Sequence, residues 1–277
     1  MSTEIPSFET IRYAVEGHVA TLTLARPDRL NSFTPQMWNE MRALGRALVA
    51  DPGDVRVLVV RGEGRAFSSG IDTTVFADPT GLAGLTDVVD HPDREVATVL
   101  TAQESYVWLA EAPFLTIAAV HGYAFGAGLQ LALACDLRVM AEGTSVGLLE
   151  HTYGIIPDLT GTQFLPRLVG TGKALELIVT AAKIDAAEAY RIGIAERLVA
   201  PDALDAEVAA LAAQVAAQPP LAVRGAKRAV RAALDGRSVR DGLLVEAESQ
   251  APCLRSDDFR EAITAFVEGR PPVYQGR

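Results

Sequence analysis

The chain has 277 residues, of which 49% are hydrophobic, enough for one large core plus a smaller appendage. Its formal net charge of −10 argues against nucleic acid as a partner, because phosphate binding needs a basic face. No uncharged apolar stretch reaches about 18 residues, so we expect no membrane span and no membrane partner.

Neither cysteine, Cys135 or Cys253, lies in a redox or metal-ligand spacing, and the four histidines show no such spacing either. We therefore expect reduced thiols and no metal. The first residues, MSTEIPSFET, lack the basic and apolar regions of a signal peptide. These features together predict a cytoplasmic protein.

Strand and helix patterns alternate along the first two hundred residues, which is typical of an α/β architecture. Residues 10–25 alternate apolar and polar positions around a Glu-Gly pair and predict a β-hairpin. Thr34 and Pro35 fit the N-cap and first residue of a helix. Further buried strands are predicted at 55–60, 115–120 and 137–141, helices at 96–110 and 127–134, and a loop at 77–93.

Strand patterns stop near residue 200, and the remainder is Ala-rich or amphipathic. Helices are predicted at 201–217, 220–235, 239–250 and 256–268. We therefore divide the chain into a core, 1–200, and a C-terminal helical region, 201–277. The apolar faces of this region need a partner, which is either the core or another subunit.

Two glycine-containing turns each follow a predicted buried strand. They are RAFSSGID at 65–72 and HGYAFGAGLQ at 121–130. Glycines at such turns either pack strand tightly against helix or let backbone N–H groups approach a ligand. Neither turn matches a P-loop or the nucleophile elbow of a hydrolase.

Two carboxylates are candidates for proton transfer. Glu150 lies in an apolar run, where it is either a solvated loop residue or a buried group whose raised pKa makes it a usable base. Asp158 lies eight residues further on, and it is either a second acid/base group or the N-cap of a helix that begins near Gly161.

Five segments in order resemble the enoyl-CoA hydratase/isomerase (crotonase) superfamily, over about residues 10–275. They are RPDRLN at 26–31, FSSGID at 67–72, HGYAFGAG at 121–128, IIPDLTGTQFL at 155–165, and the DFRE and FVE motifs at 258–268. The resemblance implies an α/β fold, a spiral of β-β-α turns with a C-terminal helical region that forms homotrimers, often dimers of trimers. It also implies an acyl-CoA substrate, with coenzyme A as part of the substrate rather than a cofactor.

By resemblance, the backbone N–H groups of Ile71 and Ala127 bind the thioester carbonyl. They would stabilise the enolate oxygen that forms when a proton leaves the acyl chain. The residues that the resemblance places against coenzyme A or substrate are Arg29, Ser69, Gly70 and Gly126.

Hydratases of this superfamily carry two glutamates twenty residues apart, but this chain has Gln130 and Glu150 there. Gln130 cannot take up a proton. The hypothesis that follows is double-bond isomerisation with Glu150 as proton shuttle and Asp158 as a possible second group, as in dienoyl-CoA isomerases. The alternatives are a 2-enoyl-CoA hydratase, with water held by Gln130 and Glu150, and a non-catalytic acyl-CoA-binding protein.

Overall fold

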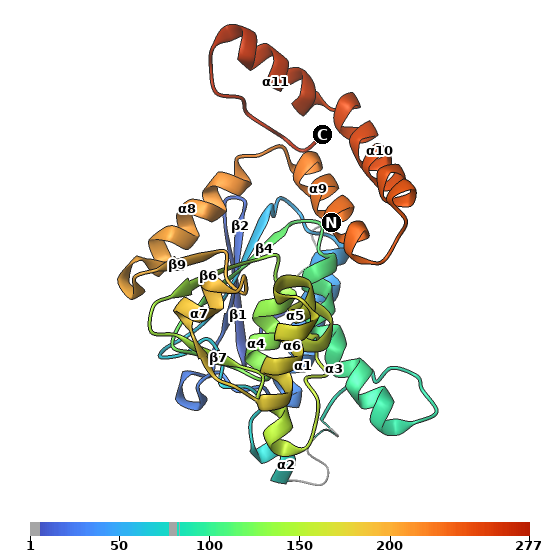
Figure 1. Cartoon of the computed structure of the whole chain (residues 1–277). Coiled ribbons are helices and arrows are strands. Elements are labelled where there is room, and N and C mark those ends of the chain that lie inside the picture. Colours follow the sequence, from blue (N-terminus) through green and yellow to red (C-terminus); the bar gives the residue numbers. More distant parts are fainter. Residues whose placement is uncertain (1–5, 78–81, 83) are drawn as a thin grey trace.

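The computed structural model describes residues 6–77, 82 and 84–277, and it shows two β-sheets with helices around them (Figure 1). The larger sheet has strand order β1-β2-β3-β4-β6-β9, antiparallel between β1 and β2 and parallel elsewhere. Its strands are β1 (Ile11–Glu16), β2 (Val19–Leu24), β3 (Val57–Gly62), β4 (Leu115–Val120), β6 (Leu137–Ala141) and β9 (Arg197–Val199).

A second, three-stranded sheet has the order β5-β7-β8. Its strands are β5 (Tyr123–Phe125), β7 (Ser145–Gly147) and β8 (Ile184–Asp185). β5 directly follows β4, β7 follows β6, and a bridge between Ser68 and Ala124 extends the same arrangement to the segment after β3. The chain therefore steps repeatedly from the larger sheet to the smaller one, which is the spiral of β-β-α turns that the sequence predicts.

Helices cover both sheets, and the last helices of the chain lie beyond the sheets. They are α1 (Pro35–Ala50), α2 (Thr74–Ala77), α3 (Arg94–Glu111), α4 (Ala127–Ala134), α5 (Gly161–Val169), α6 (Thr171–Thr180), α7 (Ala186–Arg191), α8 (Leu204–Ala216), α9 (Pro220–Leu234), α10 (Val239–Arg255) and α11 (Asp257–Glu268), with 3₁₀ turns η1 (Pro27–Arg29), η2 (Glu150–Tyr153) and η3 (Pro201–Ala203). Every residue of α4 is buried, so this short helix lies entirely within the core.

Most predicted elements are confirmed. The hairpin forms β1 and β2, and the Thr34 hydroxyl accepts a hydrogen bond from the N–H of Met37 at the start of α1. The predicted segments 115–120, 127–134 and 137–141 coincide with β4, α4 and β6. The predicted loop at 77–93 separates α2 from α3, but its residues 78–81 and 83 lie outside the described residues. Both cysteines are free thiols, Cys135 buried and Cys253 half-buried.

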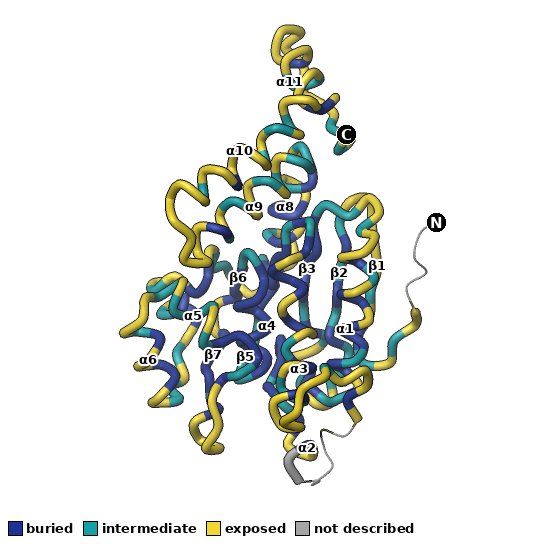
Figure 2. Tube along the Cα trace, turned by 90° about the vertical axis from the view of Figure 1, so that its right-hand side faces the viewer, coloured by how far each residue is buried: buried dark blue, intermediate teal, exposed yellow. Residues whose placement is uncertain are grey.

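The C-terminal helices differ in how they contact the core. α8 packs an apolar side against the larger sheet, where Leu204, Val208 and Leu211 are buried. α9 contacts the start of β4 through Lys227, whereas α10 and α11 extend away from the sheets and are largely exposed in Figure 2. The division at residue 200 stays a prediction, because α8 shares a core with the preceding residues. Within the described residues, no helix is both long enough and apolar enough to cross a membrane.

Candidate active site

The two glycine-containing turns lie side by side, although they are more than fifty residues apart in sequence. The N–H of Phe67 donates to the carbonyl of His121 at 2.9 Å, and the N–H of Ser68 donates to that of Tyr123 at 3.0 Å. In return, the carbonyl of Ser68 accepts from the N–H of Phe125 at 3.0 Å. This short ladder brings the later residues of the two turns, among them Ile71 and Ala127, close together.

Gly70 makes the close approach of the two turns possible. Its φ of 102° lies in the region that favours glycine, and a Cβ atom here would lie 3.0 Å from the carbonyl oxygen of Phe125. The same Cβ would lie 3.9 Å from the backbone nitrogen of Ala127. Ile71 therefore directly follows a residue that touches the start of α4.

Ile71 and Ala127 both line a cavity of about 460 Å³. Within the described residues, neither backbone N–H donates a hydrogen bond. Ala127 is the first residue of α4, where the N–H groups have no acceptor inside the helix and the helix dipole is positive. The pair can therefore present two N–H donors to one ligand oxygen.

Gln130 and Glu150 form a hydrogen-bonded, buried pair beside these donors. Nε2 of Gln130 donates to Oε1 of Glu150 at 2.7 Å. Oε1 of Gln130 accepts from the N–H groups of Leu159 at 2.8 Å and Gly161 at 2.9 Å. Because a backbone N–H can only donate, these two bonds determine which way the Gln130 amide points.

Glu150 lines the cavity and is only 7% exposed, so the alternative of a solvated loop residue is wrong. Its Oε2 is buried and has no hydrogen-bond partner among the described residues. Burial raises the pKa of Glu150 above its usual value, although the hydrogen bond from Gln130 acts in the opposite direction. Such a carboxylate can accept and return a proton closer to neutral pH.

Asp158 lines a second cavity of about 660 Å³, whose walls are mostly apolar side chains. The two cavities adjoin, because Ile71 and Ile155 line both of them. Burial raises the pKa of Asp158 as well. Its backbone carbonyl accepts a 2.6 Å hydrogen bond from Nε2 of Gln103 on α3.

The alternative that Asp158 caps α5 is wrong. Thr160 holds the N-cap position of α5, and among the described residues no side chain caps this helix. The hydroxyl of Thr160 instead donates to the carbonyl of Gln130 at 2.9 Å. The carboxylate of Asp158 is therefore not used for capping, and it lies where an acyl chain could reach it.

The four residues predicted to contact coenzyme A or substrate all line the first cavity; they are Arg29, Ser69, Gly70 and Gly126. Arg65 and Tyr153 line it too, and neither was predicted as a site residue. Within the described residues, the side chains of Arg29 and Arg65 form no ion pair. Both guanidinium groups can therefore bind phosphate oxygens.

An ion pair anchors the segment that contains Ile71. Nη2 of Arg26 lies 2.9 Å from Oδ2 of Asp72, the next residue in sequence. Burial would raise the pKa of Asp72, but hydrogen bonds from Thr74 and Arg26 outweigh it and lower the pKa to about 2. Asp72 therefore stays charged at neutral pH and holds Ile71 in place.

A family model described as enoyl-CoA hydratase/isomerase matches residues 14–277, nearly the whole chain. The chain belongs to the enoyl-CoA hydratase/isomerase family. It is thus an enzyme of the crotonase superfamily.

Relatives and solved structures agree with this assignment. "Probable enoyl-CoA hydratase echA8" of Mycobacterium bovis is 34% identical over 273 residues, covering 98% of this chain and 100% of the relative. The enoyl-CoA hydratase structure from Bacillus anthracis superimposes with a TM-score of 0.86 at 32% identity, covering 97% and 100% of the two chains.

A third similar protein has a ligand bound. A Thermobifida fusca YX structure in complex with acetoacetyl-CoA superimposes with a TM-score of 0.78 at 40% identity, covering 88% of this chain and 94% of that one. The fold of the present enzyme is therefore the mixed α/β crotonase fold, with two sheets and C-terminal helices, as the sequence predicts.

In this crotonase-family enzyme, Asp158→Asn is expected to shift the acid limb of the kcat/KM profile to lower pH. Burial raises the pKa of Glu150, and the charge of Asp158 adds to that increase. A carboxylate accepts a proton only when it is ionised, so with Glu150 as the proton acceptor we expect activity to fall as pH drops through its pKa. Removing the neighbouring charge lowers that pKa. The pH–rate profile of kcat/KM tests this prediction, and the exposed Asp202→Asn is the control. An acid limb that does not move in Asp158→Asn contradicts the prediction.

Proposed function

We propose that the enzyme adds water to a 2-enoyl-CoA thioester, with Glu150 as the proton-transfer group. The observation behind this proposal is the buried Oε2 of Glu150, which has no hydrogen-bond partner in the described part of the chain and lines the same cavity as Ile71 and Ala127. The relatives named above are enoyl-CoA hydratases, which favours hydration over the isomerisation expected from the sequence.

In this mechanism the thioester carbonyl oxygen accepts hydrogen bonds from Ile71 and Ala127. A water molecule gives a proton to Oε2 of Glu150 while its oxygen bonds to C3, and the electron pair of the double bond moves into the carbonyl to form an enolate. Protonated Glu150 then delivers its proton to C2, and the thioester re-forms. One water is added and Glu150 is regenerated.

Gln130 is a positioning residue in this mechanism. Its amide cannot carry a proton, so both proton steps belong to Glu150. Two backbone N–H groups hold its Oε1, and its Nε2 in turn holds one oxygen of Glu150. The other oxygen, Oε2 of Glu150, is then available for proton transfer.

Isomerisation is a second candidate, and Asp158 is the observation that favours it. A carboxylate with a raised pKa lies in an apolar cavity that adjoins the thioester cavity. Glu150 would remove a proton from C2 of a 3-enoyl-CoA and return it to C4. For a 3,5-dienoyl-CoA, Asp158 would serve as the second proton-transfer group at the far end of the conjugated system.

Separate incubation with a 2-enoyl-, a 3-enoyl- and a 3,5-dienoyl-CoA decides between the two reactions. Mass spectrometry in deuterated water distinguishes them, since hydration adds one water, whereas isomerisation adds none and is detected by deuterium exchanged through the carboxylate. We expect the 2-enoyl-CoA to gain water. Gln130→Glu should raise hydration relative to isomerisation, because it adds a second carboxylate beside the water. Turnover of only the 3-enoyl or dienoyl substrate would contradict the hydratase proposal, and Asp158→Asn should then impair the dienoyl reaction most.

We also propose that the enzyme forms homotrimers or dimers of trimers. α10 and α11 expose large apolar side chains to solvent, including Leu244, Phe266 and Val267, and Phe266 is 85% exposed. A single chain leaves this surface uncovered, which is unfavourable in water. Light scattering should give three or six subunits, and a stable monomer at micromolar concentration would rule this out.

A further inference from the structure

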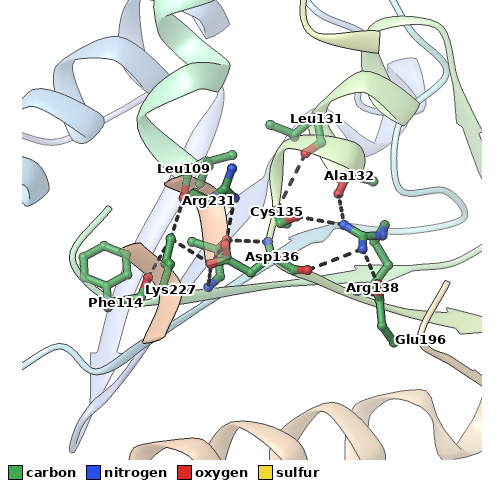
Figure 3. Close-up of polar contacts among 11 residues, drawn as sticks. Leu109, Phe114, Leu131, Ala132, Cys135, Asp136, Arg138, Glu196, Lys227 and Arg231 are labelled. Atoms are coloured by element: carbon green, nitrogen blue, oxygen red, sulfur yellow. Dashed lines mark hydrogen bonds and ion pairs between the residues drawn. The ribbon is translucent and has the colours of Figure 1, made fainter. Parts of the chain in front are cut away.

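A buried ionic cluster joins the end of α4 to the C-terminal helical region (Figure 3). Asp136 lies two residues after α4, and its carboxylate pairs with Lys227 at 2.7 Å and with Arg231 at 2.8 Å, both on α9. The backbone N–H and hydroxyl of Thr116 on β4 donate to the same carboxylate at 2.8 and 2.9 Å. The side chains of Asp136 and Lys227 are 10% and 6% exposed.

Lys227 uses all three of its N–H donors in this cluster. Besides Asp136, they reach the carbonyl of Leu109 at 3.0 Å and that of Phe114 at 2.9 Å. Leu109 lies in the last turn of α3, where carbonyls receive no hydrogen bond from N–H donors inside the helix and a cation is favourable. One side chain therefore ties α9 to α3, to the start of β4 and to the end of α4.

Arg138 holds the last turn of α4 from the other side. Its guanidinium donates to the carbonyl of Cys135 at 2.8 Å and to that of Ala132 at 3.4 Å, and it pairs with Glu196. The side chain is only 2% exposed. Ionic contacts thus surround the C-terminal end of α4, whereas its N-terminal end faces the acyl-CoA cavity.

Fold stability alone gives a weak reason for such a cluster. Replacing a buried ion pair by apolar side chains is often neutral or stabilising, because burying charges carries a large desolvation penalty. An ionic contact does impose a defined distance and direction, which an apolar contact does not. The cluster is therefore suited to fixing the position of α4.

We infer that Lys227 is a positioning residue for catalysis, which through Asp136 sets the tilt of α4 and hence the place of the Ala127 N–H. This inference rests on the proposed role of Ala127 as an oxyanion donor. An eight-residue helix is about 12 Å long, so a tilt of about 5° at one end moves the other by about 1 Å. A misplacement of about 1 Å can lower a rate by about a hundredfold.

Lys227→Met tests the inference, since it removes the charge and leaves Asp136 paired with Arg231. We expect kcat to fall about tenfold, with KM within about twofold, at a temperature well below the unfolding midpoint. The matched control is Arg228→Met on the same helix, whose partner is the exposed Glu248. The control is expected to keep its kcat.

A second readout does not depend on which reaction the enzyme catalyses. Acetoacetyl-CoA, the ligand in the Thermobifida fusca relative, ionises to an enolate with its own ultraviolet absorbance, and an oxyanion site lowers the pKa of the bound ligand. We expect Lys227→Met to raise that pKa by about one unit relative to the unaltered enzyme. A merely structural role would lower the unfolding temperature and leave this pKa unchanged.

The outcomes separate the two proposals. If the unaltered enzyme does not lower the enolate pKa, the oxyanion role of Ala127 is wrong. If it does, and Lys227→Met matches it in both kcat and enolate pKa, the positioning role of Lys227 is wrong. If Lys227→Met does not fold, Asp136→Asn decides, because it nearly keeps the shape of the side chain but removes the charge that pairs with Lys227. A shift in the same direction supports the inference, and no shift overturns it.

Discussion

Replacing Glu150 with glutamine is expected to lower kcat by about a thousandfold, because an amide cannot carry the proton that the reaction needs. The substitution nearly preserves shape, and Gln130 can still donate a hydrogen bond to the new amide oxygen. The effect should therefore appear in kcat, with KM changed little. Steady-state kinetics on the substrate that the unaltered enzyme turns over measures it.

The control for this substitution is Glu142→Gln, which alters an exposed glutamate eight residues earlier and should leave kcat unchanged. Unaltered circular dichroism and acyl-CoA affinity of Glu150→Gln would show that only the chemistry has changed. A variant that keeps more than about a tenth of the original kcat would contradict the role of Glu150.

Ala127→Pro is expected to lower kcat by about a hundredfold or more, because it deletes one of two N–H donors to the enolate oxygen. Ala127 is the first residue of α4, a position where proline is tolerated since its N–H has no acceptor inside the helix. The substitution can therefore remove the donor while α4 is kept. kcat/KM reports the loss.

Ala127→Gly is the matched control, because it keeps the backbone N–H and alters only the methyl group. We expect it to retain part of its activity. If the proline variant folds and stays within about tenfold of the original rate, the N–H of Ala127 is not a donor to the transition state.

The elements that the sequence predicts well are those with a local signal. Thr34 and Pro35 mark the start of α1, and the runs at 115–120, 127–134 and 137–141 are apolar with clear ends. β5, β7 and β8 are only two or three residues long and pair across the fold, so nothing local reveals them.

The chemistry of the site could be predicted only in part, because its contacts also join residues that are distant in sequence. The sequence contains both Gln130 and Glu150, but their 2.7 Å contact joins positions twenty residues apart. The burial of Glu150 depends on how η2 packs against the start of α4, where a Cβ on Gly126 would lie 3.2 Å from Oε1 of Glu150. No local pattern predicts that contact.

Two further cavity residues had weak signals. Arg65 is a cation at the first position of a glycine-containing turn, a place where phosphate could be bound. Tyr153 lies three residues after Glu150 in a 3₁₀ turn, so their side chains project on the same side. The ionic contacts of Lys227 were hidden, because its partners lie about a hundred residues away in sequence.

The central claim is that Glu150 moves a proton to and from the acyl chain while Ile71 and Ala127 hold the enolate oxygen. Its most direct test is deuterium exchange at C2 of a saturated acyl-CoA in heavy water. Such a ligand has no double bond to hydrate or shift, so exchange reports enolate formation alone. The account predicts deuterium incorporation by the unaltered enzyme, slower incorporation by Ala127→Pro, and none above background by Glu150→Gln. Exchange by Glu150→Gln at the rate of the unaltered enzyme would contradict it.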